Sequence, residues 1–454
     1  MPIAKERSCT FPRGGVHPPE DKDATSSQPI QRPEPPESVE VLMKQHIGAP
    51  AKVVVSRRDR VLKGQMIGEA QGFISANVHS PVSGVVRRIE NRIHNPTGSM
   101  STAVIIENDG EDEWAGGCNT ERDVSRMDAE EMATAVRNAG VVGLGGAAFP
   151  SHVKLNPRPH ESPGQSEVTD VIINGAECEP MLTCDHRLML EKTDEIVDAL
   201  QLMMHIVGAG NGHVGIETNK PDAIEAFRKT LADGSIPGIR VIPLEVKYPQ
   251  GAEQQLIAAV TGREVPAGGG LPAHVGCLVN NVATALAVRD AIRLGKPLIE
   301  RPVTVGGDAV EHAGNFMELI GTSIGHILHR QGVKDEVRLL ISGGPMMGVA
   351  QAQADVPLIK GNSGILAFAS VSDIGEQRAC IRCGRCVDAC PLGLLPGTIS
   401  VLCENRRWEE AQRRCRVKEC KECGCCAYVC PAKRRIVHMI KWCKAELAAM
   451  ENRQ

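Results

Sequence analysis

Aromatic side chains, long apolar runs and surplus charge are all scarce in this sequence of 454 residues. Only 2 % of the residues are aromatic, and the formal net charge at pH 7 is −4. Nucleic-acid-binding proteins generally present a basic face with aromatic rings on which bases stack, so we expect no nucleic-acid partner. No apolar run approaches the roughly 20 residues that span a bilayer. The first residues, Met1 to Arg7, lack the apolar core of a secretory leader. These absences predict a chain without a transmembrane segment or a signal peptide.

Cysteine, in contrast, is abundant, with 17 residues. So many thiols in a chain with no sign of secretion indicate a reducing compartment. One spacing pattern, three cysteines at intervals of three followed by a fourth and a proline, occurs twice. The two copies are Cys380-x2-Cys383-x2-Cys386-x3-Cys390-Pro391 and Cys420-x2-Cys423-x2-Cys426-x3-Cys430-Pro431.

This is the spacing of bacterial ferredoxins that hold two [4Fe–4S] clusters, in which the fourth cysteine of each copy ligates the other cluster. A zinc site would need two CxxC pairs, and a disulfide framework would need an oxidising compartment, so neither fits. Cys425 lies beside a ligand, but only Cys426 preserves the spacing. We therefore expect one cluster on Cys380, Cys383, Cys386 and Cys430, and the other on Cys420, Cys423, Cys426 and Cys390.

The N-terminal quarter predicts two different kinds of structure. Residues 1–40 are rich in proline, which pushes the preceding residue out of the helical region, so we expect an extended segment that wraps over another surface. Residues 41–115 contain short strands separated by glycine turns, which predicts a small β-sandwich. The pattern resembles the biotinyl/lipoyl hammerhead fold. Its expected hairpin tip, Ser75-Ala-Asn-Val-His79, has no lysine to modify, so we expect a structural or docking domain.

Residues 125–295 alternate strands with helices, which predicts a parallel α/β layer. A helix is expected from Ala129 to Asn138, with Asp128 as its N-cap, and one long helix over 185–207. The expected strands are 168–173, 213–216, 239–246 and a last one that begins at Cys277.

The remaining residues predict two smaller modules. Residues 296–372 combine strands with a helix near 315–330 and suggest a soluble-ligand-binding β-grasp-like module. Residues 373–454 form the bacterial-ferredoxin-like two-cluster module, which ends in a basic helix from Arg434 to about Met450. That helix is either an ordinary solvated face or a docking face for an acidic partner or anionic lipid. The whole chain is thus expected to be multidomain α/β with small β and α+β modules.

A glycine-rich loop, Gly143-Leu-Gly-Gly-Ala-Ala-Phe-Pro150, precedes the first strand of the α/β layer. Glycines let the backbone approach a phosphate, and consecutive N–H groups can cradle an anion. Lys154 could add a point charge. Taken alone, such a glycine-rich loop is more often a plain turn than a phosphate-binding loop.

Three further loops follow expected strands of the same layer. They are Asn174-Gly-Ala-Glu-Cys-Glu-Pro180, Tyr248-Pro-Gln-Gly-Ala-Glu253 and Asn280-Asn-Val-Ala-Thr284. Ligands of open α/β sheets bind beyond the carboxyl ends of the strands, so these loops could converge with the glycine loop on one pocket.

The glycine loop, extended to Lys154, resembles the FMN-binding loop of the flavoprotein subunit of respiratory complex I, although Leu144 stands where that pattern has arginine. A wider set of motifs resembles, in order and over nearly the whole chain, the C subunit of Rnf ion-translocating ferredoxin:NAD oxidoreductases. Besides the cysteine copies, the set includes Gly14-Gly-Val-His-Pro-Pro, Gln45-His-Ile-Gly-Ala, His79-Ser-Pro-Val-Ser-Gly, Ala176-Glu-Cys-Glu-Pro and the Tyr248 loop. A cobalamin reductase of microcompartments shares these modules, but its hammerhead piece follows the clusters.

The resemblance implies non-covalent FMN, an NAD(H) site beside it and two [4Fe–4S] clusters. FMN would convert the electron pair of NADH into single electrons for the clusters. The residues implied at the flavin are Gly143, Gly145, Gly146, Lys154, Asn174, Tyr248, Asn280, Asn281 and Thr284. Those implied as catalytic near the nicotinamide are Glu177, Glu179 and Glu253, with Tyr248 close to them. Cys178, Cys184 and Cys277 are expected to be small buried hydrophobic residues.

The resemblance also implies a peripheral subunit on the cytoplasmic face of the cell membrane. Its partners would be other Rnf-type subunits, including an iron–sulfur subunit and integral membrane subunits, with ferredoxin acting indirectly. Two alternatives remain open: an electron-transfer adaptor without a nicotinamide site, and a cobalamin or quinone reductase of the same module family.

Overall fold

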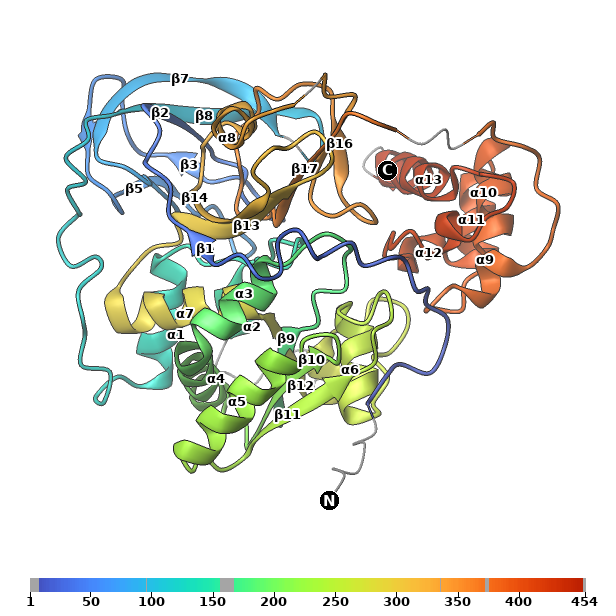
Figure 1. The fold of residues 1–454 in the computed structure, drawn as a ribbon, viewed down its shortest axis with the longest axis horizontal. Helices are drawn as coiled ribbons and strands as arrows, with labels where there is room; N and C mark the ends of the chain where they lie inside the picture. The colour runs from blue at the N-terminus through green and yellow to red at the C-terminus, as the bar shows by residue number, and fades with distance from the viewer. Residues whose placement is uncertain (1–7, 95, 156–166, 335, 372–374, 452–454) are drawn as a thin grey trace.

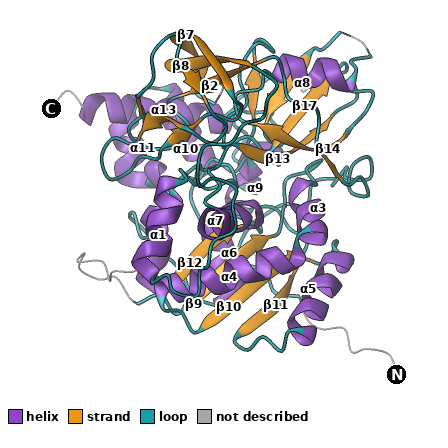
Figure 2. Ribbon diagram, turned by 90° about the vertical axis from the view of Figure 1, so that its left-hand side faces the viewer, coloured by secondary structure: helices purple, strands orange, loops and turns teal. Residues whose placement is uncertain are grey.

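The computed structural model describes residues 8–94, 96–155, 167–334, 336–371 and 375–451. Three bodies are packed together, and a fourth, built from the C-terminal helices, forms a lobe at one side (Figure 1). An α/β layer lies on one side of the molecule and two β-rich bodies lie on the other (Figure 2).

The α/β body is built on four parallel strands in the order β11-β10-β9-β12. The central strand β9 is buried along most of its length, which is typical of a parallel strand covered on both faces. The strands are β9 (Asp170–Gly175), β10 (Asn211–Glu217), β11 (Ile239–Leu244) and β12 (Cys277–Asn281). The expected strands are therefore present, with ends shifted by a few residues.

Helices pack on this sheet. They are α1 (Ala129–Asn138), α2 (Ser151–Lys154), α3 (Cys184–Glu191), α4 (Thr193–Val207), α5 (Pro221–Asp233), α6 (Glu253–Thr261), α7 (Val282–Leu294) and the 3-10 turn η1 (Pro272–Val275). Asp128 caps α1 as predicted, in a reciprocal capping box with Glu131.

The single long helix that we expected over 185–207 is wrong, because the chain breaks between α3 and α4. Lys192 leaves the helical region, with φ −136° and ψ 34°. The Thr193 hydroxyl donates to the Met189 carbonyl at 2.6 Å, and such local side-chain bonds compete with the regular helix ladder.

The second body is a six-stranded mixed sheet in the order β1-β14-β13-β17-β15-β16. Its elements are β1 (Ile30–Gln31), β13 (Glu300–Gly306), β14 (Gly314–Leu319), β15 (Leu339–Ser342), β16 (Val349–Gln351), β17 (Gly364–Phe368) and α8 (Ile324–Gln331). The helix expected near 315–330 is only half right, because its first part forms β14, where Asn315 and Phe316 are buried.

The third body contains two small antiparallel sheets, β2-β8-β7-β4 and β3-β5-β6. Their strands are β2 (Ser38–Leu42), β3 (Lys52–Val53), β4 (Arg60–Val61), β5 (Met66–Glu69), β6 (Val78–His79), β7 (Gly84–His94) and β8 (Ser99–Asn108). Alternate residues such as Val39 and Val41 fill the core between the sheets. The predicted β-sandwich is present, and β2 begins a few residues before position 41.

A buried lysine joins the three bodies at the expected hairpin tip. Lys360, which is 1 % exposed, donates to the Asn77 carbonyl at 3.1 Å and to the Gly140 carbonyl at 2.7 Å. Burial lowers the pKa of Lys360 to about 7. A lysine from the neighbouring body thus holds the hairpin connection at Asn77 against the α/β body.

The C-terminal lobe is helical. It contains α9 (Arg385–Asp388), α10 (Pro396–Glu404), α11 (Trp408–Cys415), the 3-10 turn η2 (Val417–Glu419), α12 (Cys425–Tyr428) and α13 (Ile436–Glu451). Cys403, Cys415 and Cys443 are buried in its apolar core, so these extra thiols act as small hydrophobic residues. None of the helices in the described residues is long and apolar enough to span a membrane.

The first described residues form a strap that runs along the α/β body, the helical lobe and the six-stranded sheet (Figure 1). We use "strap" for residues 8–32. The backbone of Cys9 forms an isolated β-bridge with Leu244 of β11. Gly15 N–H donates to the Ala389 carbonyl of the helical lobe at 3.0 Å, and β1 pairs with β14 of the six-stranded sheet. The prediction that this segment wraps another surface is confirmed for residues 8–32, whereas residues 1–7 lie outside the described residues.

Candidate functional site

The glycine loop is held open at the edge of the α/β sheet. Gly143 N–H donates to the Phe149 carbonyl at 2.8 Å, and Leu144 N–H donates to the Thr284 hydroxyl at 2.8 Å. Gly146 has φ +99°, and a side chain placed there would meet open space. The loop therefore presents free backbone that a ligand can approach.

The N-terminus of α7 lies directly behind this loop. The Asn281 amide oxygen caps α7 by accepting from Ala283 N–H at 2.9 Å. A Cβ on Gly145 would lie 3.3 Å from Asn281 Cβ. A helix N-terminus next to a glycine loop attracts anions through its free N–H groups and dipole, so this corner suits the phosphate of a nucleotide cofactor. The predicted residues Gly143, Gly145, Asn281 and Thr284 are thus brought together.

Lys154 and Glu253 also lie together, at the carboxyl edge of the sheet. Lys154 Nζ is 2.6 Å from Glu253 Oε1 and donates to the Val279 carbonyl at 3.2 Å. Asn174 connects two of the predicted loops, because its amide donates to the Gly251 carbonyl at 2.7 Å. Asn280 points elsewhere: it is 5 % exposed and its amide faces Met203 Sδ at 3.3 Å in the core.

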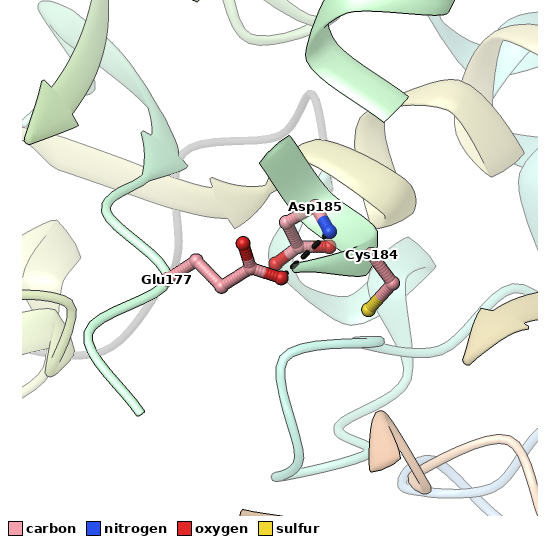
Figure 3. A group of neighbouring side chains, drawn as sticks. All are labelled: Glu177, Cys184 and Asp185. Atoms are coloured by element: carbon pink, nitrogen blue, oxygen red, sulfur yellow. Dashed lines mark hydrogen bonds between the residues drawn. The ribbon is translucent and has the colours of Figure 1, made fainter. Parts of the chain in front are cut away.

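Glu177, Cys184 and Asp185 form a compact group beside these loops (Figure 3). Glu177 accepts from the backbone N–H groups of Asp185 at 2.7 Å and His186 at 3.1 Å, so it caps α3. Burial, and then the nearby Glu177 charge, raise the pKa of Asp185 to about 7. Because both Glu177 oxygens accept backbone bonds, this carboxylate serves as a side-chain cap for the N-terminus of α3.

Three cations beneath the loops were missed from the sequence. Arg301 of β13 is fully buried and donates to the Leu144 carbonyl of the glycine loop at 3.3 Å. Lys220 donates to the Ala176 carbonyl at 2.7 Å, and Lys22 of the strap donates to the Glu177 carbonyl at 2.7 Å. Only Lys220 carried a signal, since it follows strand β10 as the other site loops follow their strands.

Glu179 and Tyr248 face the helical lobe and the body next to it. Glu179 accepts from the backbone N–H groups of Met346 and Met347, both at 2.9 Å. Burial raises the pKa of Glu179 to about 7, opposed by these two bonds. Tyr248 Oη donates to the Cys423 carbonyl at 2.7 Å. These two predicted residues therefore connect the α/β body to its neighbours.

Cys390 lies with the second cysteine copy, as the exchange of fourth ligands requires. A small cavity is lined by Cys390, Cys420, Cys423 and Cys426. Burial, and then the charges of Cys420, Cys423 and Cys390, raise the pKa of the Cys426 thiol. Four convergent soft thiolates suit an iron–sulfur cluster.

The other cysteine copy leaves a similar space. A Cβ on Gly397 would lie 3.2 Å from Cys386 Sγ and 3.9 Å from Cys380 Sγ, so a residue without a side chain keeps room beside these thiols. Cys383 is exposed and Cys430 is half-buried. All 17 cysteines are free thiols, which leaves both copies available for clusters.

The two cysteine sets differ in their position relative to the α/β body. Cys425 is fully buried and its thiol faces the Tyr248 carbonyl at 3.9 Å. Tyr248 and Cys425 share an apolar cluster with Val16 of the strap and Ala389. The set around Cys423 therefore faces the α/β body, whereas the set around Cys383 faces outward.

Three family descriptions match parts of the chain. They are the RnfC barrel sandwich hybrid domain over residues 10–111, the Nuo51 FMN-binding domain over residues 136–290 and the 4Fe-4S dicluster domain over residues 373–431. Together with the geometry above, they define the class: a redox protein that joins an FMN-binding domain to an iron–sulfur module.

Full-length relatives narrow the class to a family. The chain is 45 % identical over 97 % of its length to the C subunit of a proton-translocating ferredoxin:NAD(+) oxidoreductase complex from Clostridium ljungdahlii, covering 95 % of that protein. It is 42 % identical over 97 % of its length to the Na(+)-translocating counterpart from Acetobacterium woodii, covering 98 % of it. The C subunit of an ion-translocating oxidoreductase complex from Rhodobacter capsulatus is 44 % identical over 85 % of this chain and 73 % of its own length. The chain belongs to the family of C subunits of ion-translocating ferredoxin:NAD oxidoreductase (Rnf) complexes, and it is an oxidoreductase subunit that transfers electrons.

Proposed function

We propose that this chain exchanges electrons between NAD(H) and ferredoxin-derived carriers through one FMN and two [4Fe–4S] clusters. It does so as a peripheral subunit on the cytoplasmic face of the membrane. Its partners are the other subunits of the complex, including an iron–sulfur subunit and integral membrane subunits. The relatives named above are subunits of such complexes, which supports the assignment.

The flavin site is the corner between the glycine loop and the N-terminus of α7. Gly143, Gly145 and Gly146 let the backbone approach the phosphate, and Asn281 and Thr284 keep the helix N-terminus and loop in place. Lys154 and Asn174 supply polar contacts at the sheet edge. Bound FMN would supply the conversion between the two electrons of one hydride and the single electrons that iron–sulfur clusters carry.

Glu177, Glu179, Glu253 and Tyr248 complete the site toward the nicotinamide and the clusters. Glu177 fixes the start of α3, and Glu253 balances the Lys154 charge. Tyr248 holds the Cys423 loop against the α/β body. The clusters are held by Cys380, Cys383, Cys386 and Cys430, and by Cys420, Cys423, Cys426 and Cys390.

The observation that carries the proposal is the direct bond from Tyr248, in a loop of the flavin site, to the backbone of cysteine ligand Cys423. It fixes a loop of the flavin site against one set of cluster ligands. A flavin bound there would lie nearer to a cluster on the Cys423 set, which we call the inward cluster, than to one on the Cys383 set, the outward cluster.

Anaerobic titration of the reconstituted chain with NADH tests the proposal. We expect NADH to bleach the FMN absorbance and then to produce cluster EPR signals, with about eight iron and eight sulfide per chain. Flavin that stays oxidised in excess NADH, with the clusters intact, would favour the adaptor without a nicotinamide site.

A further inference from the structure

The outward cysteine loop is surrounded by cations. Arg378, Arg382 and Arg385 lie within or beside the loop that carries Cys383, and all three are exposed. A second segment adds to them, because Arg378 N–H donates to the Ala432 carbonyl at 3.0 Å. We call this surface the basic face; its cations are Arg378, Arg382, Arg385, Lys433 and Arg435.

The acidic groups among the described residues of the same segments, 375–388 and 432–435, are fewer. They are Glu376 and Asp388, both exposed. Within the described ranges, none of the five cations of the basic face is in an ion pair, whereas their neighbour Arg434 pairs with Glu404 at 2.6 Å. Five cations against two carboxylates give this face a positive surplus on a chain whose net charge is −4.

The centre of the basic face is apolar and close to the thiols. Ile381, between Cys380 and Cys383, is 66 % exposed, and Val387 is 36 % exposed. An exposed aliphatic centre inside a charged rim is typical of a protein docking site. The inward set, in contrast, is covered by Tyr248 and the strap. In Figure 1, α12 faces the rest of the molecule and α9, which contains Arg385, lies farther out.

We propose that the basic face docks an acidic protein that carries its own one-electron iron–sulfur centre at its surface. This inference rests on the proposed function and adds the place and the charge of the partner. A negatively charged carrier is repelled by a net acidic chain except where cations cluster, so the field steers it to this loop. Contact there brings the carrier next to the exposed Cys383 set.

Binding of a purified acidic ferredoxin with two [4Fe–4S] clusters to the holoprotein tests the proposal. We expect calorimetry to show binding that weakens as salt rises, since the pair is held by opposite charges. Arg385→Glu should weaken binding by about tenfold or more. The matched control Arg413→Glu, which reverses another exposed charge on α11 of the same lobe, should change it by less than about twofold.

Several results would overturn the proposal. One is equal loss of binding in both charge reversals, and another is ferredoxin binding that does not depend on salt. A third is that ferredoxin does not bind, whereas anionic phosphatidylglycerol vesicles bind the wild type but not Arg385→Glu. That result would assign the basic face to lipid instead. If NADH bleaches FMN in both variants, the flavin part of the proposed function is intact. A failure of the docking proposal can therefore be told apart from a failure of the proposed function. Iron and sulfide content checks that the lobe has kept its clusters.

Discussion

At the scale of single residues, the spacing of the cysteines was the most informative feature of the sequence. The repeated spacing predicts that Cys390 serves the second copy, and the structure places Cys390 at one cavity with Cys420, Cys423 and Cys426. Arg301 could not be predicted, because its bond to the glycine loop joins segments of two different bodies. The orientation of the Asn280 side chain depends on packing against Met203 of α4, which residue type alone does not reveal.

Tyr248 gives a prediction with a built-in control, since the chain has only two tyrosines. Tyr248→Phe leaves the Cys423 carbonyl without its donor, which costs about 1 kcal/mol. We expect the midpoint for thermal loss of cluster absorbance to fall by about 2–4 °C. Tyr428→Phe, at a side chain that is 49 % exposed in the same lobe, should leave the midpoint unchanged. Equal shifts in the two variants would contradict a specific role for the Tyr248 bond.

Lys360 gives a prediction on pH. Its pKa is about 7 in the folded chain, against 10.5 for the free side chain, so the unfolded chain binds more protons between these values. Stability from this group therefore rises with pH above about 7. Lys360→Met removes that rise. The thermal midpoint of the wild type minus that of the variant should increase between pH 6.5 and pH 9. Titratable groups that both proteins share contribute equally to the two midpoints and cancel in the comparison. A difference in midpoint that stays constant with pH would disprove the expectation.

At the scale of elements, regular strands and helices were predicted well where hydrophobic periodicity was strong, as in α1 and the four parallel strands. The strap was predicted only as extended chain, because a proline-rich segment has no periodicity and its contacts lie far away in the sequence. One such contact joins Thr10 to Gln250, 240 residues apart, at 2.9 Å.

Gly14 tests what the strap does. It has φ +68°, and a Cβ there would lie 2.6 Å from the Cys390 carbonyl carbon, so Gly14→Ala pushes the strap away from a cluster ligand. We expect slower reduction of the clusters after FMN is bleached by NADH in stopped-flow measurements, together with greater solvent exchange at Ala389 and Cys390.

Gly98→Ala is the matched control for that variant. Gly98 has a similar φ, +65°, but nothing within 4 Å of its Cβ position, so it carries the same backbone strain without the clash. Its kinetics should equal those of the wild type. If Gly14→Ala and Gly98→Ala behave alike, strap contact with Cys390 does not set the rate.

At the scale of the whole molecule, the arrangement of bodies gives the two cysteine sets different positions relative to the FMN-binding domain. Which set faces that domain could not be predicted from cysteine spacing, because the two copies are equivalent in sequence. It follows from the Tyr248 loop and the shared apolar cluster around Cys425.

Single replacement of a ligand in each set checks whether electrons pass from FMN to the inward cluster before the outward one. In Cys383→Ser, NADH should still bleach FMN and reduce the inward cluster, because the path up to it is intact. In Cys423→Ser, FMN should bleach while the outward cluster is reduced at least about tenfold more slowly, since its nearest donor is missing. Freeze-quench EPR follows each cluster, and iron content confirms that one has been retained. Rapid reduction of the remaining cluster in Cys423→Ser would reverse the order.

The strap also bears on how the protein is made. Gly15 of the strap and its bonding partner Ala389 of the helical lobe lie 374 residues apart in the chain. This contact therefore forms only after Ala389 has been synthesised. Until then the strap leaves Cys390, the neighbour of Ala389, uncovered, so a cluster can be inserted there before the strap closes over it.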